Sequence, residues 1–497
     1  MNGYNFEQPS RQSIKGIIVI FGVTAYKIIK GTIVVIAVFL LKYIRSDKNI
    51  DFLSFKTVGI SISIILLFLI IAFLKYLNFQ FYVKDDHFFL KKGIFNKEEI
   101  SVASSKIQNV YIKQNLLQQL INVVSLSIET AGDDKTEIEI LALPKVKANA
   151  LKAYLLQSKA HNDRLNTNSL EEAVFYKASV KKLFLEGISE NHFKSFVLIF
   201  AFIIGIYNDV KAFVEQLDLN AVFGSWFQLD EESLVGLLLF NISIVVALFI
   251  ISFLFSLVMM FIKNFKLTVK QKEEGLEISK GLFNKINLAL SASRIQNTTI
   301  YTNKLKQVFG LYKLSFTQAM ANKKQQRNFN IVGLNRGQIS ELLHQFYPKV
   351  EGQIIKNRPN IYMLYRLVLM STVMLVIINV LLFFWSKLFL LINIPLILYL
   401  AANAFYTYKK SYYHLDNEYI AIGGGRLIDT TTSFLEIKKT QAVSLNQTLF
   451  QKQRGLASVT IYSASKSVTI PHINLADAYR VKDYLLYKVE HENKNWM

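Results

Sequence analysis

The sequence contains no cysteine, and this absence excludes several kinds of chemistry. A chain without thiols forms no disulfide framework, offers no thiol nucleophile and cannot hold cysteine-ligated zinc or an iron–sulfur cluster. The stability of the fold must therefore come from packing within the chain and against lipid. The redox compartment stays undetermined.

Acidic residues are also scarce, since 36 of them face 57 lysines and arginines, which gives a net charge of +21. Such an excess predicts an acidic partner. Because 52% of the residues are hydrophobic, the nearest candidate is the anionic inner leaflet of a membrane, which attracts each juxtamembrane cation by about 1 kcal/mol. Nucleic acid is the other candidate, but the sequence has no reading helix and no interleaving of basic and aromatic residues. We therefore expect no nucleic-acid partner.

Catalytic and metal-binding motifs are missing as well. The seven histidines are scattered and form no HExxH or other ligand spacing. The run Gly423 to Gly425 lacks the strand–helix context of a dinucleotide loop, and acidic pairs such as Asp85-Asp86 are typical of turns. The sequence thus predicts no enzyme activity, no metal and no cofactor.

Long apolar segments point to a multi-pass membrane protein, because about 20 apolar residues cross a bilayer. The polar stretch Met1–Ser13 does not look like a signal peptide, and Gly16–Tyr26 reads as a basic interfacial helix. We expect six membrane-spanning helices in three hairpins: Ile28–Ile44, Thr57–Leu77, His192–Tyr207, Ser233–Ile262, Tyr362–Phe384 and Leu388–Tyr408.

The distribution of lysine and arginine predicts the orientation. The linker Asp209–Glu232 holds only Lys211 as a cation, whereas Lys263 and Lys266 begin a basic group at the other end of the following span. That linker should face outward. We therefore expect a plasma (inner) membrane protein with both termini and its other domains in the cytoplasm.

An internal repeat is the most informative feature. The stretch from Gly93 to Ala131 matches the stretch from Gly281 to Ala319 without a gap, at an offset of 188 residues (296 minus 108). A third copy begins near Lys439 at an offset of 333 (441 minus 108). Every copy follows a predicted membrane hairpin. The chain therefore consists of three hairpin-plus-domain units.

Each copy alternates apolar and polar residues with a period of two, as half-buried strands do, and then closes with a helical pattern. The fold class expected is membrane α + β, with each hairpin followed by a small β-sandwich or partly open barrel capped by a C-terminal helix. The predicted boundaries are 1–80 for the basic segment and hairpin 1, 81–160 for domain 1, 161–190 for a linker, 191–262 for hairpin 2, 263–350 for domain 2, 351–408 for hairpin 3 and 409–492 for domain 3.

These segments resemble the bacterial pleckstrin-homology (PH) domain membrane proteins of the YdbS/YdbT type, in particular the longer YdbT-like members. The resemblance rests on FYVKDDHFFLKKG, SSKIQNVYIKQNLLQQLINVVSLSIETAG and LPKVKANALKAYL in the first copy, and on the threefold layout. It implies a seven-stranded PH-like fold, no catalysis and a plasma-membrane location. It defines no ligand.

Candidate ligand-binding residues are lysines and arginines near turns. Lys91 and Lys92 precede the Gly93 turn, and Lys106, Arg294 and Lys439 recur at one position of the repeat. A repeated cation could grip a lipid phosphate or an acidic peptide; the alternative is solvated surface charge. The repeat-signature residues have a structural interpretation, as partners for backbone groups or as turn glycines, and are Gln108, Gln296, Gln441, Gly93, Gly281 and Gly425.

The function expected is a non-catalytic scaffold or accessory protein that binds lipid headgroups or membrane protein partners, in a role such as envelope maintenance or stress tolerance. Anionic lipid, a smaller hairpin-plus-PH protein and self-association are the expected partners. A transporter or channel component with PH-like regulatory domains is the alternative. The predicted spans offer Asn241, Asn379 and Asn393 but no central ionisable residue, and isolated asparagines also serve as helix-packing groups.

Overall fold

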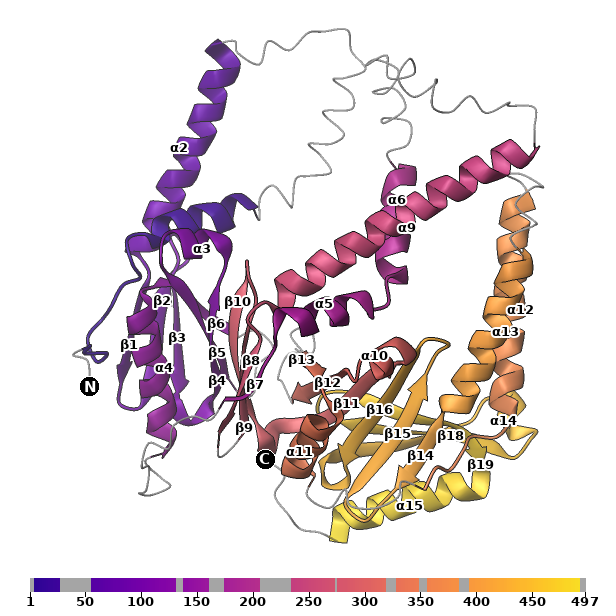
Figure 1. The fold of residues 1–497 in the computed structure, drawn as a ribbon. Helices are drawn as coiled ribbons and strands as arrows, with labels where there is room; N and C mark the ends of the chain where they lie inside the picture. Colours follow the sequence, from indigo (N-terminus) through magenta and orange to yellow (C-terminus); the bar gives the residue numbers. More distant parts are fainter. Residues whose placement is uncertain are drawn as a thin grey trace. The chain divides into compact units, whose positions relative to one another are not determined.

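The computed structural model describes residues 4–26, 55–130, 137–160, 174–205, 234–272, 275–318, 328–347, 355–383 and 393–491. The chain forms two compact units (Figure 1). Unit 1 contains residues 1–175, 269–291 and 320–325, and unit 2 contains residues 176–268, 292–319 and 326–497. The second copy of the repeat is therefore divided between the units.

The first copy begins with an antiparallel hairpin, β1 (Gln80–Lys84) and β2 (His87–Lys92), followed by β3 (Glu98–Ala103). The aromatic-rich stretch from Phe81 to Leu90 forms two strands, because the pair Asp85-Asp86 divides it. Both aspartates have positive φ, 49° and 60°, as the two central residues of a type I′ hairpin turn require. We call β1–β3 the leading sheet of this copy.

A second antiparallel group follows the leading sheet, and we call it the trailing sheet. It consists of β4 (Ile107–Gln114), β5 (Val124–Thr130) and β6 (Glu137–Leu143), with the short helix α3 (Leu116–Leu120) between β4 and β5. Helix α4 (Lys145–Ala160) then packs on β4 and β5. The alternation seen in the sequence is the reason for two layers, because it gives each sheet one apolar face.

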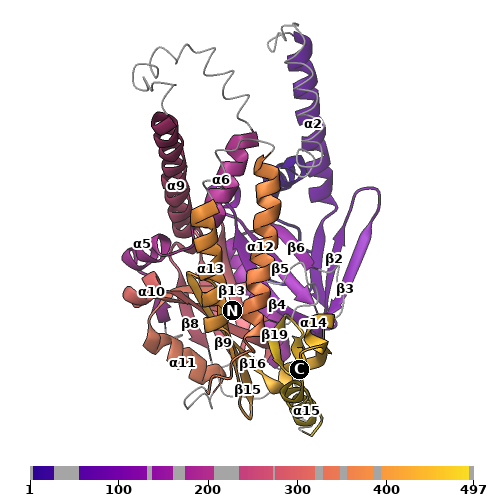
Figure 2. The ribbon, with the colours of Figure 1, turned by 90° about the vertical axis from the view of Figure 1, so that its right-hand side faces the viewer.

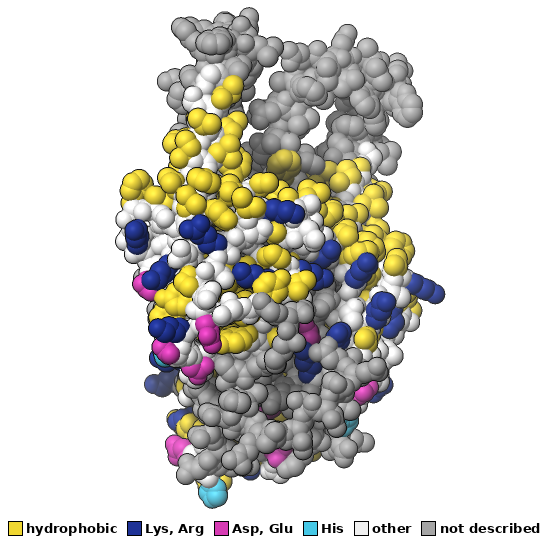
Figure 3. Space-filling model, turned by 90° about the vertical axis from the view of Figure 1, so that its left-hand side faces the viewer, with side chains coloured by type: hydrophobic (Ala, Val, Ile, Leu, Met, Phe, Trp, Pro, Cys, Tyr) yellow, Lys and Arg dark blue, Asp and Glu magenta, His cyan; other side chains and the backbone are white. Residues whose placement is uncertain are grey.

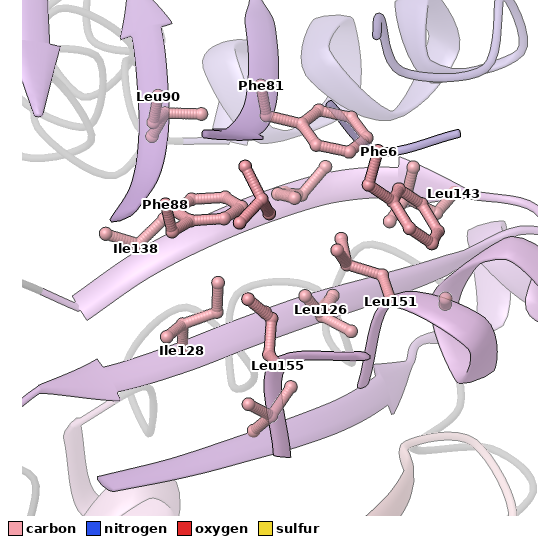
Figure 4. Close-up of a cluster of buried hydrophobic side chains, with 14 of the residues drawn as sticks. Phe6, Phe81, Phe88, Leu90, Leu126, Ile128, Ile138, Leu143, Leu151 and Leu155 are labelled. Carbon is pink, nitrogen blue, oxygen red and sulfur yellow. The ribbon is translucent and has the colours of Figure 1, made fainter. Parts of the chain in front are cut away.

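The core of the first copy lies between these layers (Figure 4). Phe81 and Phe88 of the leading sheet, Leu126 and Ile128 of the trailing sheet and Leu151 of α4 are all at most 1% exposed. Burying one such side chain contributes about 1.5–3 kcal/mol. Helix α4 thus covers the part of the core that the leading and trailing sheets do not cover.

The second and third copies repeat this order. The second copy consists of β8 (Thr268–Lys272), β9 (Gly275–Lys280), β10 (Lys285–Ser291), β11 (Ile295–Asn303), α10 (Lys304–Val308), β12 (Tyr312–Gln318), β13 (Asn328–Leu334) and α11 (Arg336–Phe346). The third copy consists of β14 (Tyr412–Leu415), β15 (Tyr419–Gly425), β16 (Asp429–Glu436), β17 (Thr440–Asn446), α14 (Leu449–Lys452), β18 (Leu456–Ser463), β19 (Ser467–Asn474) and α15 (Leu475–His491).

The sheets run from one copy into the next, whereas the sequence predicts a separate small β-sandwich or partly open barrel in each copy. One sheet has the order β6-β5-β4-β10-β9-β8-β7, where β7 is Val174–Lys177, and another has the order β13-β12-β11-β16-β15-β14. The trailing sheet of each copy therefore joins the leading sheet of the following copy. We call β4·β10 and β11·β16 the first and second junctions (Figure 1).

The prediction of six membrane-spanning helices was wrong. Among the described residues only two segments are long and apolar enough to cross a membrane, Val245–Asn264 in α9 (Leu234–Asn264) and Tyr362–Val380 in α12 (Tyr362–Phe383). The predicted span at 28–44 lies outside the described residues. The other three predicted spans give helices whose apolar parts are too short: α2 (Phe55–Leu77), with its apolar stretch at Ile62–Leu77, α6 (Phe193–Gly205) and α13 (Asn393–Lys410), which ends in Tyr-Thr-Tyr-Lys-Lys.

Helices α12 and α13 lie side by side in both ribbon views (Figures 1 and 2). Their asparagines bind one another, because Asn379 Nδ2 donates to Asn393 Oδ1 at 2.9 Å and Asn393 Nδ2 donates to Asn379 Oδ1 at 2.6 Å. A reciprocal amide pair is a helix-packing contact. This geometry favours the packing role of these two residues over a substrate-binding role.

Candidate functional site

A short helix follows the first strand of every trailing sheet, and we call α3, α10 and α14 the tip helices. Each begins at a residue whose side-chain oxygen accepts a hydrogen bond from the backbone N–H three residues later. The capping residues are Asn115, Asn303 and Thr448. Their recurrence at one repeat position explains why the helix starts there in all three copies.

The tip helices expose large apolar side chains. Leu120 is 82% exposed in α3, Val308 at the equivalent position of α10 is 79% exposed, and Leu449 and Phe450 of α14 are 80% and 64% exposed. A single exposed leucine needs no explanation, but exposed apolar side chains on all three tip helices do, even though the third copy has Gln453 at the position of Leu120 and exposes Leu449 and Phe450 instead. The arrangement fits contact with a membrane or with an apolar partner surface.

Neighbouring helices extend these apolar surfaces. In unit 1, Ile14 and Ile18 are 68% and 48% exposed, and Lys15 Nζ donates to the backbone carbonyl of Ile121, just after α3, at 3.3 Å. In unit 2, helix α5 (Val180–Ile188) exposes Val180 and Phe184. Figure 3 shows hydrophobic side chains gathered across the upper part of one face, with lysines and arginines among and below them.

Cations of the tip region stack on tyrosines of the long helices in unit 2. Lys304 Nζ lies 5.5 Å from the ring centre of Tyr406 in α13, and Arg454 Cζ lies 4.8 Å from the ring centre of Tyr362 in α12. Tyrosine and basic residues are typical of the headgroup region at the ends of membrane helices. The tip of the second copy therefore lies beside α13 at Tyr406. The tip of the third copy lies beside the first residue of α12, Tyr362.

The third residue of each tip helix is buried, and its identity differs between copies. Gln118 donates from Nε2 to Ser125 Oγ at 2.6 Å and to the Leu141 carbonyl at 2.7 Å. Gln451 uses the same atom to reach Ser458 Oγ at 2.9 Å. Both glutamines thus tie the tip helix to its trailing sheet.

The second copy has Lys306 at this position, and the lysine is paired with carboxylates from another part of the chain. Lys306 Nζ binds Glu186 of α5 and lies 3.0 Å from Glu190 Oε1. The side chains of Glu186 and Lys306 are 0% and 5% exposed. Burial opposes the charged form of Lys306, but the two carboxylates outweigh it and raise the pKa of the lysine. The cluster therefore fixes the tip helix to α5 by charge.

His472 anchors α12 to the third copy. Its backbone carbonyl accepts from Asn360 N–H at 2.7 Å, its Nε2 lies 3.1 Å from Arg366 Nη1, and its Nδ1 lies 2.8 Å from Gln451 Nε2. Burial and the nearby Arg366 lower the pKa of the imidazole. The sequence gives no spacing motif that could identify this group.

The candidate ligand residues of the first copy lie at the end of β2 and between β3 and β4. Lys91 pairs with Glu99 at 3.1 Å and Lys92 with Glu98 at 3.3 Å, and all four side chains are at least 41% exposed. Lys106 is exposed. A lipid-binding role for these three lysines stays a prediction.

The equivalent cations of the other copies have different surroundings. Arg294 is half-buried. Lys439 is buried, and its Nζ donates to the backbone carbonyl of Ile295 at 2.6 Å and lies 3.1 Å from Glu436 Oε2. Lys439 therefore holds the second junction.

The repeat-signature residues also differ between copies. The glycines have positive φ, 110°, 109° and 145° at Gly93, Gly281 and Gly425, and a Cβ at any of them would lie at most 2.2 Å from a backbone oxygen. Gln296 is 1% exposed, whereas Gln441 is exposed. The side chain of Gln108 lies outside the described residues.

Two sequence signals locate the tips: the capping residue, and the glutamine or lysine three residues after it. Asparagine or threonine three residues before glutamine or lysine marks α3, α10 and α14. The substitution of lysine for glutamine at position 306 signals a buried charge, but its partners Glu186 and Glu190 are more than 100 residues away. Sequence reasoning alone cannot find that pairing.

Comparisons with known proteins agree with the repeat. A family model described as "Bacterial PH domain" matches three stretches of the chain, residues 20–159, 218–350 and 366–489. The chain is also 23% identical over 485 residues to the UPF0699 transmembrane protein YdbT of Bacillus subtilis, with 92% of this chain and 94% of that protein covered. The three matched stretches contain the three copies.

Proposed function

Because the chain belongs to the bacterial PH domain family, we propose that it is a membrane-anchored, non-catalytic scaffold whose three tips contact the headgroup region of the plasma membrane from the cytoplasmic side. Each tip would insert a few apolar residues and bring lysine and arginine to anionic headgroups. Three weak contacts on one chain raise the effective concentration of each, so modest single affinities give firm association. The scaffold would hold its sheet surfaces close to the membrane for protein partners.

The observation that carries this proposal is the threefold recurrence of exposed apolar side chains at the tips. Leu120, Val308 and Leu449 are each at least 79% exposed. Burial of a leucine-sized side chain in the membrane interface contributes about 1.5–3 kcal/mol by area. The energy of three such contacts is enough to orient the domains on a bilayer that already holds α9 and α12.

The junctions support placing all three copies on one side of the membrane. Strands cannot pair across a bilayer, because their backbone hydrogen bonds join neighbours about 4.8 Å apart. The first and second copies pair through β4·β10, and the second and third copies through β11·β16. Each junction therefore favours placing the two copies that it joins on the same side of the membrane.

The test uses the full chain in nanodiscs with about 30% anionic lipid or with zwitterionic lipid only. A cysteine at position 120, 308 or 449 of this cysteine-free chain carries an environment-sensitive fluorophore. A blue shift that grows with anionic lipid is expected at all three positions. The matched control is a label at His87, which is exposed at the start of β2, at the other end of that strand from the β2–β3 turn.

The control label should report water in both kinds of nanodisc. Identical water-like emission from the tip labels and from the control would overturn the proposal. A chain with one labelled tip cysteine and serine at the other two tip positions should show a smaller blue shift, because the labelled tip loses the effective concentration that the other two contacts supply.

A further inference from the structure

Two strand edges at the ends of the repeat have no junction partner among the described residues. At the junctions, the first strand of a trailing sheet (β4 or β11) pairs with the third strand of the following leading sheet (β10 or β16). In the third copy the equivalent of β4 is β17, which forms the edge of the sheet β17-β18-β19. In the first copy the equivalent of β10 is β3, which forms the edge of β1-β2-β3. The strands β17 and β3 are therefore edges, although their equivalents in the other copies pair at a junction.

Exposure along β17 shows the consequence of the missing neighbour. In β11, which pairs with β16, Gln296 and Asn297 are 1% and 0% exposed. Their equivalents in β17, 145 residues later (441 minus 296), are Gln441 and Ala442, and both are exposed. The same comparison holds for Phe434 of β16, which is 3% exposed and whose equivalent in β3, Ser101, is exposed.

Both existing junctions use one register. Ile112 of β4 lies opposite Asn287 of β10. Ile300, its equivalent in β11, lies opposite Thr432 of β16. Since Thr432 is the equivalent of Asn287 at the 145-residue offset (432 minus 287), the pairing is a repeated feature of the module. Transferred to the ends of the chain, this register places Leu445 of β17 opposite Glu99 of β3.

The other edge of each leading sheet is covered. Ser10 exchanges two backbone hydrogen bonds with Phe81 of β1, at 2.8 and 2.9 Å, and Asn357 exchanges two with Tyr413 of β14, both at 2.9 Å. Strand β7 occupies the same place beside β8. Within the described residues, the outer edges of the three leading sheets are therefore alike, and the junction edges differ between the terminal copies and the middle one.

The residues of β17 also lack the usual protection of an edge strand. Natural edges are blunted by charge, proline or short length. Thr440–Asn446 is seven residues long and contains neither a charged residue nor proline. On β3, Glu98 and Glu99 are paired with Lys92 and Lys91 of β2, so the approaching strand would meet balanced charge.

We propose that β17 of one molecule pairs with β3 of a second copy of this chain, in the register of the internal junctions. The contact is heterologous, because the two surfaces differ, and it therefore leaves a free β3 at one end and a free β17 at the other. It produces rows or closed rings of molecules in the plane of the membrane. This goes beyond the proposed contact with lipid and does not depend on it.

The experiment uses engineered cysteines in the cysteine-free chain. Two differently tagged full-length chains, one with Leu445→Cys and one with Glu99→Cys, are co-expressed and oxidised in native membranes. Residues directly opposite on antiparallel strands have Cα atoms about 4.5–5.5 Å apart, which suits a disulfide. We expect a band at twice the mass of the chain that carries both tags and disappears on reduction.

Two further pairs serve as controls. The slipped pair Leu445→Cys with Glu98→Cys points the two thiols to opposite faces of the sheet and should give no such band. The pair Ile112→Cys with Asn287→Cys in one chain should close within that chain at the first junction, which verifies folding and oxidation.

The outcomes distinguish the proposal from its rivals. A doubled band for the matched pair alone supports it, and a ladder of multiples should follow when Leu445→Cys and Glu99→Cys are in the same chain. Equal bands for the matched and slipped pairs would overturn it, as would crosslinks confined to single chains. Absence of the doubled band while the internal control closes would mean that something other than a second copy covers these edges, and would also overturn it.

Discussion

Lys439 donates from Nζ to the backbone carbonyl of Ile295, 144 residues earlier, at 2.6 Å. The contact joins the third copy to the first residue of β11 in the second copy, and Glu436 completes it at 3.1 Å. A cation that the sequence presents as a candidate lipid-binding residue thus stabilises the pairing between modules.

Lys439→Ala should destabilise the second junction by about 1–3 kcal/mol, because the buried carbonyl of Ile295 loses its donor. Hydrogen exchange of β11 and β16 in the full-length protein measures this loss. Lys438→Ala is the matched control, since Lys438 is 48% exposed and pairs with the same Glu436, and it should cost at most about 1 kcal/mol. Equal protection in the two variants would show that Lys439 has no structural role.

Lys306→Gln should detach α5 from the second copy, although glutamine is the natural residue at positions 118 and 451. The variant leaves Glu186 buried without its cation, which costs about 3–5 kcal/mol. The double variant Glu186→Gln with Lys306→Gln removes both charges and should regain most of the loss. Exchange rates of the α5 amides measure each step, and a double variant no better protected than Lys306→Gln alone would contradict the pairing.

The first junction should weaken in acid through Glu277 of β9. Burial alone would raise the pKa of this carboxyl, but Lys272 at 2.7 Å and Lys152 of α4 at 3.6 Å outweigh it, so the pKa is lowered from its ordinary value of 4.5. A lowered pKa gives stability that is present above the unfolded value and is lost as the pH falls through the folded value.

Protection of the β9 and β10 amides should therefore decline below about pH 4.5 in the natural chain. Glu277→Gln should flatten this dependence. Glu98→Gln, which removes a carboxylate that is 56% exposed, should not. If protection of the β9 and β10 amides declined in acid as much in Glu277→Gln as in the natural chain, groups other than Glu277 would be responsible.

The anchor of α12 should loosen on mild acidification. The pKa of His472 is lowered from 6.5 by burial and by Arg366, so its contribution to stability is present above pH 6.5 and is lost as the pH falls through the lowered folded value. Exchange of the amides at 360–366 should accelerate as the pH falls below about 6.5, after correction for intrinsic rates.

His472→Asn is the variant to compare. Asparagine tolerates the positive φ of 50° at this position and does not titrate. It should remove the pH dependence of the α12 anchor, whereas His414→Asn, a change in another histidine of the same copy, should leave it intact. A pH response that survives His472→Asn would exclude this histidine as its source.

Much of the local structure can be predicted from the sequence because it depends on neighbouring residues. Asn115, Asn303 and Thr448 begin helices by capping their own backbone, and Gly93, Gly281 and Gly425 supply positive φ where a Cβ would clash. The offset of 188 residues between Gln108 and Gln296 reveals the repeat itself. Hydropathy overestimates the membrane helices, because it counts apolar residues without fixing where each helix begins and ends.

The sequence by itself therefore determined the repeated module, its caps and its turns, since these depend on contacts a few residues apart. Only the tertiary structure decided that β4 pairs with β10 and β11 with β16, that Lys439 and Lys306 are buried, and that β3 and β17 are left as edges. The physical reason is that strands join through backbone groups that every residue carries. No single residue therefore determines which strand becomes the neighbour, and the pairing is decided only when the sheets assemble.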